Sequence, residues 1–274
     1  MRPPLMASLQ PHPNPVDLRG KRVLVTGASS GIGEAGALKL AREGAIVVVA
    51  ARRQELLDGV VERILDAGGE AQAHACDLSD LDAVDELVAR VEGDLGGIDI
   101  LINNAGRSIR RPLAESLDRW HDVERTMTLN YYSPLRLIRG FAPGMRKRGD
   151  GHIINVSTWG VLSESSPLFS VYNASKAALT AVSRVIETEW AADGVHSTTL
   201  FYPLVKTAMI APTRAYDGLP GLSAEEAADW MVTAARTRPV RIAPRMAVTA
   251  HALNSFAPGA VDAIMKRQRV QPRD

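Results

Sequence analysis

Tyr172 and Lys176 are the two side chains in this sequence that are best suited to moving a proton. They are four residues apart in a predicted helix over about 171–192, so they share one face of that helix. An ammonium group beside a phenol favours the phenolate, which lowers the tyrosine pKa from its ordinary value of about 10. We therefore expect Tyr172 to exchange protons near neutral pH, with Lys176 supplying the necessary field.

A glycine-rich turn between Thr26 and Gly33 has the composition of a phosphate-binding loop. It follows the apolar run 22–25, which we predict as a buried strand, and it precedes a helical pattern through Leu40. Glycines without side chains let a pyrophosphate approach the unpaired amides at the helix N-terminus, where the helix dipole also favours negative charge. The glycines of this turn are Gly27, Gly31 and Gly33.

Strand-like and helix-like segments alternate along the chain, which predicts an α/β fold with a parallel sheet covered on both faces. Further strands are predicted over 46–51, 71–76, 98–102, 153–157 and 195–201. Helices are predicted over about 56–68, 80–91, 117–141, 171–192 and 224–236. The region after residue 236 is less readable, and we expect it to be a helical extension of the same domain.

The composition is that of a globular protein with a large core. Of the 274 residues, 46% are hydrophobic and 23% are charged, and the formal net charge is +1. This balance gives no long-range field toward nucleic acid, so we expect no nucleic-acid partner. We predict a single domain over 16–274 and, because prolines crowd residues 1–15, a disordered N-terminal extension.

Metal, disulfide and membrane-spanning sites are not expected from the residues. The six histidines lack the spacing of metal ligands, and the single cysteine, Cys76, cannot form an internal disulfide. No apolar run approaches the roughly 18 residues that a membrane span requires. We therefore expect a soluble, cytoplasmic protein with no metal and no integral membrane segment.

Two further motifs identify a family. The chain reads Asn-Asn-Ala-Gly at 103–106 and Tyr-Asn-Ala-Ser-Lys at 172–176, and together with the glycine turn these resemble the short-chain dehydrogenase/reductase family. The resemblance covers roughly 18–209 and looks like the single-domain branch of that family. It implies a Rossmann-type, doubly wound parallel sheet of about seven strands, with one nicotinamide cofactor across the carboxyl ends of the strands.

The resemblance implies catalytic roles for several residues. Tyr172 would exchange the substrate proton, Lys176 would also hold the cofactor ribose, and Asn130 would kink the middle helix and hold a water that relays protons to the lysine. The family's catalytic serine lies three residues after a strand asparagine. Counting from Asn155 gives Thr158, with Ser157 just before it, and the stretch from there to Tyr172 is one residue longer than usual. Both hydroxyls therefore remain candidates.

Cofactor contacts also follow from the resemblance. An acidic residue normally meets the 2′-hydroxyl of NAD at the end of the second strand, whereas here Ala51 is followed by two arginines. A guanidinium suits a 2′-phosphate, so we expect NADP(H) as cofactor, although Ser30 lacks the basic side chain found there in some members. The expected contacts are Gly27, Ser29, Ser30, Gly31, Ile32, Gly33, Arg52, Arg53, Asp77, Leu78, Asn104, Ala105, Gly106, Tyr172, Lys176, Pro203, Val205 and Thr207.

The expected function is an NADP(H)-dependent oxidoreductase that interconverts a carbonyl and an alcohol. We predict an apolar or lipid-like substrate because the residues expected to wall the site are Trp159, Leu162, Met209 and Ile210. The segment 202–213, with the helix after it, also looks like the reductase domains of bacterial fatty acyl-CoA reductases. Three arginines follow the Asn-Asn-Ala-Gly motif, and we expect their loop to face water: Arg107, Arg110 and Arg111.

Two other functions remain open at this point. One is an NAD-preferring steroid-type or sugar-type dehydrogenase of the same family, and the other is a cofactor-binding sensor or scaffold without turnover. The two long helices resemble those through which family members associate, so we expect a homodimer or homotetramer.

Overall fold

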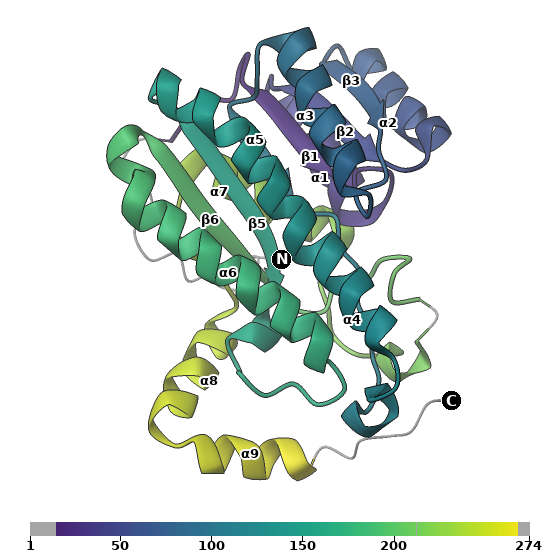
Figure 1. The fold of residues 1–274 in the computed structure, drawn as a ribbon, viewed down its shortest axis with the longest axis vertical. Helices are drawn as coiled ribbons and strands as arrows, with labels where there is room; N and C mark the ends of the chain where they lie inside the picture. The colour runs from purple at the N-terminus through teal and green to yellow at the C-terminus, as the bar shows by residue number, and fades with distance from the viewer. Residues whose placement is uncertain (1–14, 212, 268–274) are drawn as a thin grey trace.

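The computed structural model describes residues 15–211 and 213–267 (Figure 1). The predicted N-terminal extension over 1–15 lies outside these residues, apart from residue 15. One parallel sheet has the strand order β3-β2-β1-β4-β5-β6-β7, which confirms the predicted fold class. Its strands are β1 (Arg22–Thr26), β2 (Ile46–Ala51), β3 (Glu70–Ala75), β4 (Ile100–Asn103), β5 (Gly151–Thr158), β6 (Val195–Tyr202) and β7 (Arg241–Ile242).

The strand order reverses between β1 and β4, and in such sheets ligands bind in the crevice at the carboxyl ends of the strands near that point. Strand residues alternate between the two faces, so Val23 and Val25 enter one core while Leu24 enters the other. The two-residue strand β7 is too short for the sequence pattern to predict.

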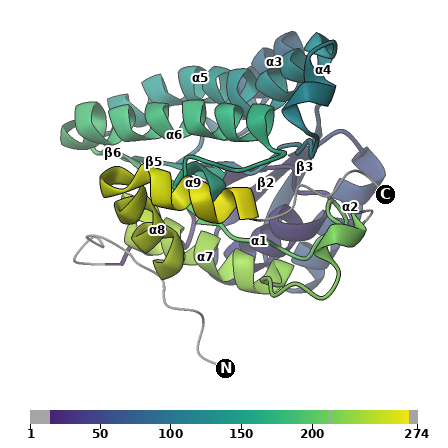
Figure 2. The same cartoon turned by 90° about the horizontal axis from the view of Figure 1, so that it is seen from below.

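Two layers of helices cover the sheet (Figure 2). On one face lie α1 (Gly31–Arg42), α2 (Gln54–Asp66) and α7 (Ala224–Thr237). On the other lie α3 (Leu81–Leu95), α4 (Trp120–Met127), α5 (Ser133–Arg148) and α6 (Ser170–Trp190). The apolar faces of these helices supply the large buried side chains of both cores, including Trp230 and Phe141.

The predicted single helix over 117–141 differs from the structure in two respects. It is divided into α4 and α5 by a π-helical turn, Thr128–Tyr132, and it continues to Arg148. Pro143 does not end it, because its ring lies on the exposed side of the helix, where water can satisfy the carbonyl that loses its partner. Gly149 ends the helix in the left-handed conformation, with φ of 67°.

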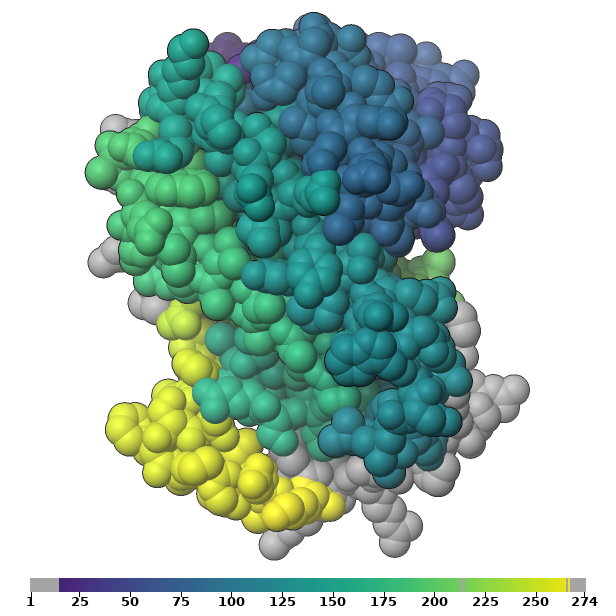
Figure 3. Space-filling model, in the orientation of Figure 1, coloured from purple at the N-terminus to yellow at the C-terminus, as the bar shows by residue number. Residues whose placement is uncertain are grey.

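Two helices, α8 (Arg245–Phe256) and α9 (Pro258–Arg267), follow β7. They lie at the lower end of the molecule in Figure 1 and appear in yellow in the space-filling view of Figure 3. Seen from below, they cross in front of the sheet between the two helical layers (Figure 2).

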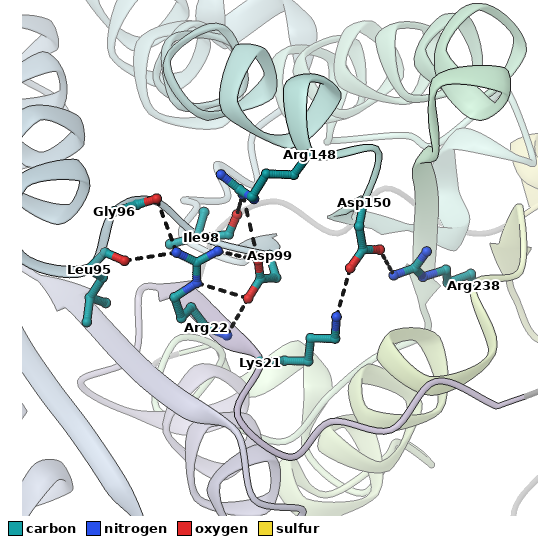
Figure 4. A network of polar contacts seen from close by, with 9 residues as sticks. All are labelled: Lys21, Arg22, Leu95, Gly96, Ile98, Asp99, Arg148, Asp150 and Arg238. Carbon is teal, nitrogen blue, oxygen red and sulfur yellow. Dashed lines mark hydrogen bonds and ion pairs between the residues drawn. The ribbon is translucent and has the colours of Figure 1, made fainter.

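Charged side chains hold the opposite end of the sheet together (Figure 4). Asp99 precedes β4 and accepts hydrogen bonds from the backbone and the guanidinium of Arg22, the first residue of β1. Asp150 precedes β5 and pairs with Lys21 at 2.8 Å and with Arg238 at 2.6 Å. The Arg22–Asp99 bond joins the neighbouring strands β1 and β4, and the Asp150 bonds tie the start of β5 to the segments before β1 and β7. The carboxyl ends of the strands carry the motifs described next.

Candidate active site

The glycine turn after β1 packs so closely that side chains cannot be added to it. A methyl group on Gly27 would lie 2.9 Å from Ala105 Cα, and one on Gly33 would lie 2.4 Å from Gly27 O. Gly27 and Gly31 have φ of 67° and 61°, a region that favours glycine. Ser30 precedes α1 without a side-chain cap, so the turn presents helix amides to a ligand.

The end of β4 is bonded directly to the end of β1. The Thr26 hydroxyl donates to Ile102 O at 3.1 Å and accepts from the amides of Asn104 and Ala105. The Asn104 amide group donates to Thr26 O at 2.9 Å. The motif at 103–106 and the glycine turn, which are about 75 residues apart in sequence, therefore form one rigid corner of the crevice.

The loop after β6 covers this corner. Thr207 Cγ2 would lie 3.2 Å from a methyl group on Gly31, so the loop contacts the turn. Val205 is buried and pairs with Leu222, which anchors the loop to the segment before α7. Pro203 and Thr207 are half-buried at the opening.

The remaining expected cofactor residues follow β2 and β3. Arg52 and Arg53 are exposed just after β2, and the neighbouring Ala51 is buried. Asp77 is exposed and accepts from the amide of Ser79 at 2.9 Å. Leu78, in contrast, lies in the core beneath α3, so only its backbone is available to a ligand.

The two candidate hydroxyls at the end of β5 point to different partners. The Thr158 side chain lies close enough to the phenol of Tyr172 to lower its pKa by hydrogen bonding. Ser157 is buried, and its hydroxyl lies 3.2 Å from that of Thr180. Thr158 is thus the hydroxyl that shares a site with Tyr172, and the residue inserted after it does not move it away.

Lys176 is buried, and its Nζ donates to Val156 O at 2.8 Å. A methyl group on Gly106 would lie 3.3 Å from this nitrogen and 3.2 Å from Asn130 Oδ1. The motif after β4, the middle helix and the ammonium of α6 therefore meet at one point beside Tyr172.

Asn130 lies fully buried in the π-helical turn between α4 and α5. Its side chain accepts from Arg107 N at 2.9 Å and donates to Arg107 O at 2.9 Å and to Ser175 Oγ at 3.0 Å. Ser175 in turn donates to Tyr172 O at 2.7 Å. Isolated π-helical turns often occur at functional sites, and this one fixes Asn130 between the β4 loop and α6. The sequence alone does not predict this role for Ser175, because one serine inside a motif carries no spacing signal of its own.

The pKa values of the pair differ from the expectation. Desolvation raises the pKa of Tyr172 to about 12, nearby Tyr216 adds to the rise, and the Thr158 hydrogen bond opposes it. Burial lowers the pKa of Lys176 to about 8. The predicted depression of the tyrosine pKa by the lysine is therefore wrong, because desolvation of the phenolate is the largest cause and Lys176 is not among the groups that shift this pKa.

The arginine loop after β4 is also only partly as expected. Arg111 is buried and pairs with Asp122, which also accepts from Arg119 at 2.9 Å. These two hydrogen bonds lower the pKa of Asp122 to about 2. Arg107 and Arg110 are half-buried, so the expected water-facing loop is instead pinned to the start of α4.

The predicted apolar walls separate into two groups. Trp159 and Met209 are exposed near the opening, whereas Leu162 is buried in a small cluster with Phe201, Ala243 and Ala247. Leu162 thus supports the loop from behind. Tyr216, close enough to Tyr172 to affect its pKa, lies on the loop after β6, and the irregular sequence there gave no sign of its position.

Within 15–211 and 213–267, no group of histidine, cysteine and acidic side chains has the arrangement of a metal site. Over the same residues, no helix is both long enough and apolar enough to cross a bilayer. Cys76 is buried, and burial raises its thiol pKa to about 11.

Known proteins share this arrangement. The family described as short chain dehydrogenase matches residues 21–217. A fatty acyl-CoA reductase of Mycobacterium tuberculosis is 69% identical over 274 residues, covering 99% of this chain and 93% of that protein. A fatty acyl-CoA reductase of Acinetobacter baylyi is 46% identical, with coverage of 91% and 84%. A solved metagenomic short-chain oxidoreductase in complex with NADP superposes with a TM-score of 0.68 at 32% identity, covering 80% and 93%. The chain belongs to the short chain dehydrogenase family of oxidoreductases.

Proposed function

We propose that this protein is an NADP(H)-dependent reductase of fatty acyl substrates, which reduces the carbonyl carbon of a long-chain acyl thioester to the aldehyde. The observation that carries the proposal is its 69% identity, over almost the whole chain, to a protein named fatty acyl-CoA reductase. The Tyr172, Lys176 and Thr158 cluster supports a reaction at a carbonyl, because it offers a proton and a hydrogen bond to one oxygen.

NADP(H) suits the residues of the crevice. The glycine turn presents uncapped backbone amides at the N-terminus of α1, which suit a pyrophosphate, and we expect Lys176 to hold a ribose. Arg52 and Arg53 are exposed beyond β2 and suit a 2′-phosphate, with no carboxylate at Ala51 to repel it. When bound, the reduced nicotinamide supplies the hydride.

In the proposed reaction the protein controls the proton and the oxygen. The Thr158 hydroxyl and the Tyr172 phenol bind the carbonyl oxygen, and Tyr172 gives its proton to this oxygen as the hydride reaches the carbon. A tyrosine with a raised pKa is fully protonated at neutral pH, which suits reduction. Lys176, with a pKa of about 8, can return a proton to Tyr172. The water that Asn130 is expected to hold would then relay a proton to Lys176.

For a thioester, the step balances as one hydride and one proton for each carbonyl. The carbon–hydrogen bond forms, and the carbonyl π-electrons take the proton from Tyr172 to give a hemithioacetal. The hemithioacetal collapses when its O–H bond breaks, its carbonyl re-forms and its carbon–sulfur bond breaks. The departing thiolate takes up the proton that the hydroxyl loses, giving an aldehyde and a free thiol. The exposed Trp159 and Met209 and the half-buried Ile210 supply apolar surface for an acyl chain.

Steady-state kinetics with purified protein tests the proposal. Short, medium and long acyl-CoA thioesters and the matching aldehydes are supplied with saturating NADPH, and both NADPH loss and product are measured. We expect kcat/KM to rise with chain length by about fourfold per methylene until the pocket is filled. Tyr172→Phe is the control, since it should bind NADPH without turnover. A flat profile, or the absence of thioester and aldehyde reduction, would overturn the proposal.

We further propose that the protein self-associates through α6. Small side chains on its exposed side, at Ala174, Ala177 and Ala181, continue into Val185, which is 50% exposed. Such a stripe lets a second helix pack closely. Sedimentation should show that Ala177→Glu dissociates a homodimer or homotetramer, and a monomeric wild type would contradict the proposal.

A further inference from the structure

A pocket of about 270 Å³ lies at the β7 edge of the sheet. Its walls come from α6, β6, β7, α8 and the stretch that begins with the turn Trp159–Val161 after β5. It is not lined by Thr158, Tyr172 or Lys176. The pocket is therefore separate from the reacting groups described above, and the proposed reaction makes no use of it.

The pocket continues the face of α6 that carries the catalytic ammonium. Lys176, Thr180 and Arg184 follow one another at intervals of four residues, so each lies about one turn beyond the last on the same side of the helix. Thr180 and Arg184 line the pocket. The Thr180 hydroxyl donates to Lys176 O at 2.8 Å and lies 3.2 Å from Ser157 Oγ. The pocket thus begins about one turn of α6 beyond the candidate active site.

One wall of the pocket is apolar. Leu162 and Phe201 form it from within a small buried cluster, and the half-buried Val161 and Val240 extend it. His251 joins this wall to α8, since its Nδ1 donates to Leu162 O at 3.0 Å; a carbonyl only accepts, so this nitrogen carries the hydrogen. An apolar chain placed against the wall would be removed from water.

Two guanidinium groups line the pocket, and no acidic residue lines it. Arg184 is exposed on α6 and Arg241 is half-buried on β7, and within 15–211 and 213–267 neither side chain has a hydrogen bond or an ion pair. The charged arginines and glutamates of the surrounding segments 159–166, 180–187, 241–242 and 245–256 are Arg184, Arg241, Arg245, Glu164 and Glu187. The surroundings therefore keep a positive charge when both carboxylates are counted.

Those two carboxylates are bonded to other groups. Glu187 accepts from Ser197 N at 2.7 Å. Glu164 accepts from the Asn254 amide at 2.7 Å and lies 3.7 Å from His251 Nδ1. Neither forms an ion pair with the two arginines of the pocket. An anionic ligand would consequently meet two guanidinium groups that no protein carboxylate neutralises by direct contact.

We propose that this pocket binds a second small ligand, a carboxylate with a short apolar chain, whose head group is held by Arg184 and Arg241. The chain lies on the wall formed by Leu162 and Phe201. At about 30 Å³ for a group the size of a water molecule, the pocket holds on the order of nine such groups, which matches a carboxylate of about eight carbons. The binding does not depend on the proposed function, so the two proposals can fail separately.

Titration calorimetry with the full chain, in the presence of NADPH, tests the proposal. Octanoate is compared with acetate, with neutral octanol and with inorganic phosphate. We expect octanoate to bind most tightly, because it alone uses both the guanidinium groups and the apolar wall. Arg184→Gln with Arg241→Gln should weaken octanoate binding about ten- to hundredfold. The matched control, Arg139→Gln, replaces an exposed arginine of α5 and should change nothing.

Two further variants place the ligand. Arg110→Gln changes a half-buried arginine of the loop after β4 and should leave octanoate affinity unchanged, whereas an equal loss would put the ligand in the crevice. Arg184→Lys with Arg241→Lys keeps both charges and should retain part of the affinity. Thermal unfolding shows that each variant is folded. The proposal is overturned if octanoate does not bind at millimolar concentration, if octanol or phosphate binds as tightly, or if Arg139→Gln or Arg110→Gln loses as much affinity as the glutamine pair.

Discussion

Replacing the hydroxyl of Thr158 tests the site most directly, because Thr158 and its neighbour Ser157 both carry a hydroxyl group but point it toward different partners. Thr158 faces Tyr172, whereas Ser157 is buried against Thr180. Thr158→Val keeps the branched shape and removes the hydroxyl that would polarise the carbonyl. Loss of one such donor costs about a hundred- to thousandfold in kcat, so we expect a loss of that size.

The same substitution has a stability component that must be measured separately. The Thr158 oxygen also accepts from the amide of Gly160 at 3.3 Å, and leaving that buried amide unpaired costs about 1–3 kcal/mol. Thermal unfolding of Thr158→Val and of Ser157→Ala should therefore show comparable losses. Thr158→Ser restores the hydroxyl and should recover kcat to within about tenfold of wild type.

Initial rates of NADPH oxidation, with aldehyde saturating, measure all three variants. Ser157→Ala should keep kcat within about threefold of wild type, because its hydroxyl bonds only within the core. If Ser157→Ala lost more activity than Thr158→Val, the substrate oxygen would have to lie on the other side of β5. The assignment based on the Tyr172 contact would then be wrong.

Three more outcomes are expected. Arg52→Ala should weaken NADPH about ten- to hundredfold in fluorescence titration and leave NADH unchanged; equal losses would remove the 2′-phosphate assignment. Tyr172→Phe should bind NADPH normally and lose at least about a hundredfold in turnover, and retained activity would require another proton donor. Asp99→Asn should lower unfolding free energy by about 3 kcal/mol in urea at neutral pH, with Asp66→Asn as the exposed control. Burial alone would raise the pKa of Asp99, but the hydrogen bonds from Arg22 lower it below the unfolded value of 3.8. The stabilisation is therefore present above pH 3.8 and is lost as the pH falls through the lowered pKa of the folded state. A difference in unfolding free energy between wild type and Asp99→Asn that persists in acid would contradict this.

The sheet could be predicted from sequence because buried parallel strands are continuous apolar runs. The stretch Ile46–Ala51, for example, was predicted with the bounds that β2 has in the structure. The π-helical turn at Asn130 could not be predicted, since its residues continue the pattern of an ordinary helix and the extra residue per turn depends on tertiary contacts. Strand β7 could not be predicted either, because it has only two residues and is recognised by its pairing with β6.

Within the candidate site, motif spacing predicted which segments meet but not where their side chains point. Ser157 and Thr158 are adjacent on a strand, so they face opposite sides, and sequence alone could not say which side holds Tyr172. The burial of individual side chains could not be predicted either. In sequence Arg111 resembles Arg107 and Arg110, which are half-buried, and only the fold shows that Arg111 is buried and paired with Asp122. Desolvation likewise depends on all surrounding atoms, which explains why the direction of the Tyr172 pKa shift was missed.

The two pKa shifts at the site fit a single physical account. Tyr172 and Lys176 lose water together, which raises the pKa of the acid that is neutral when protonated and lowers the pKa of the acid that is charged when protonated. Their values move apart as a result, to about 12 for Tyr172 and about 8 for Lys176, so the ammonium becomes a much stronger acid than the phenol. Once Tyr172 has given its proton to the substrate oxygen, proton transfer from Lys176 to the phenolate is downhill, whereas an exposed lysine and tyrosine would be nearly matched. The burial that keeps Tyr172 protonated for reduction is therefore the same feature that enables Lys176 to reprotonate it.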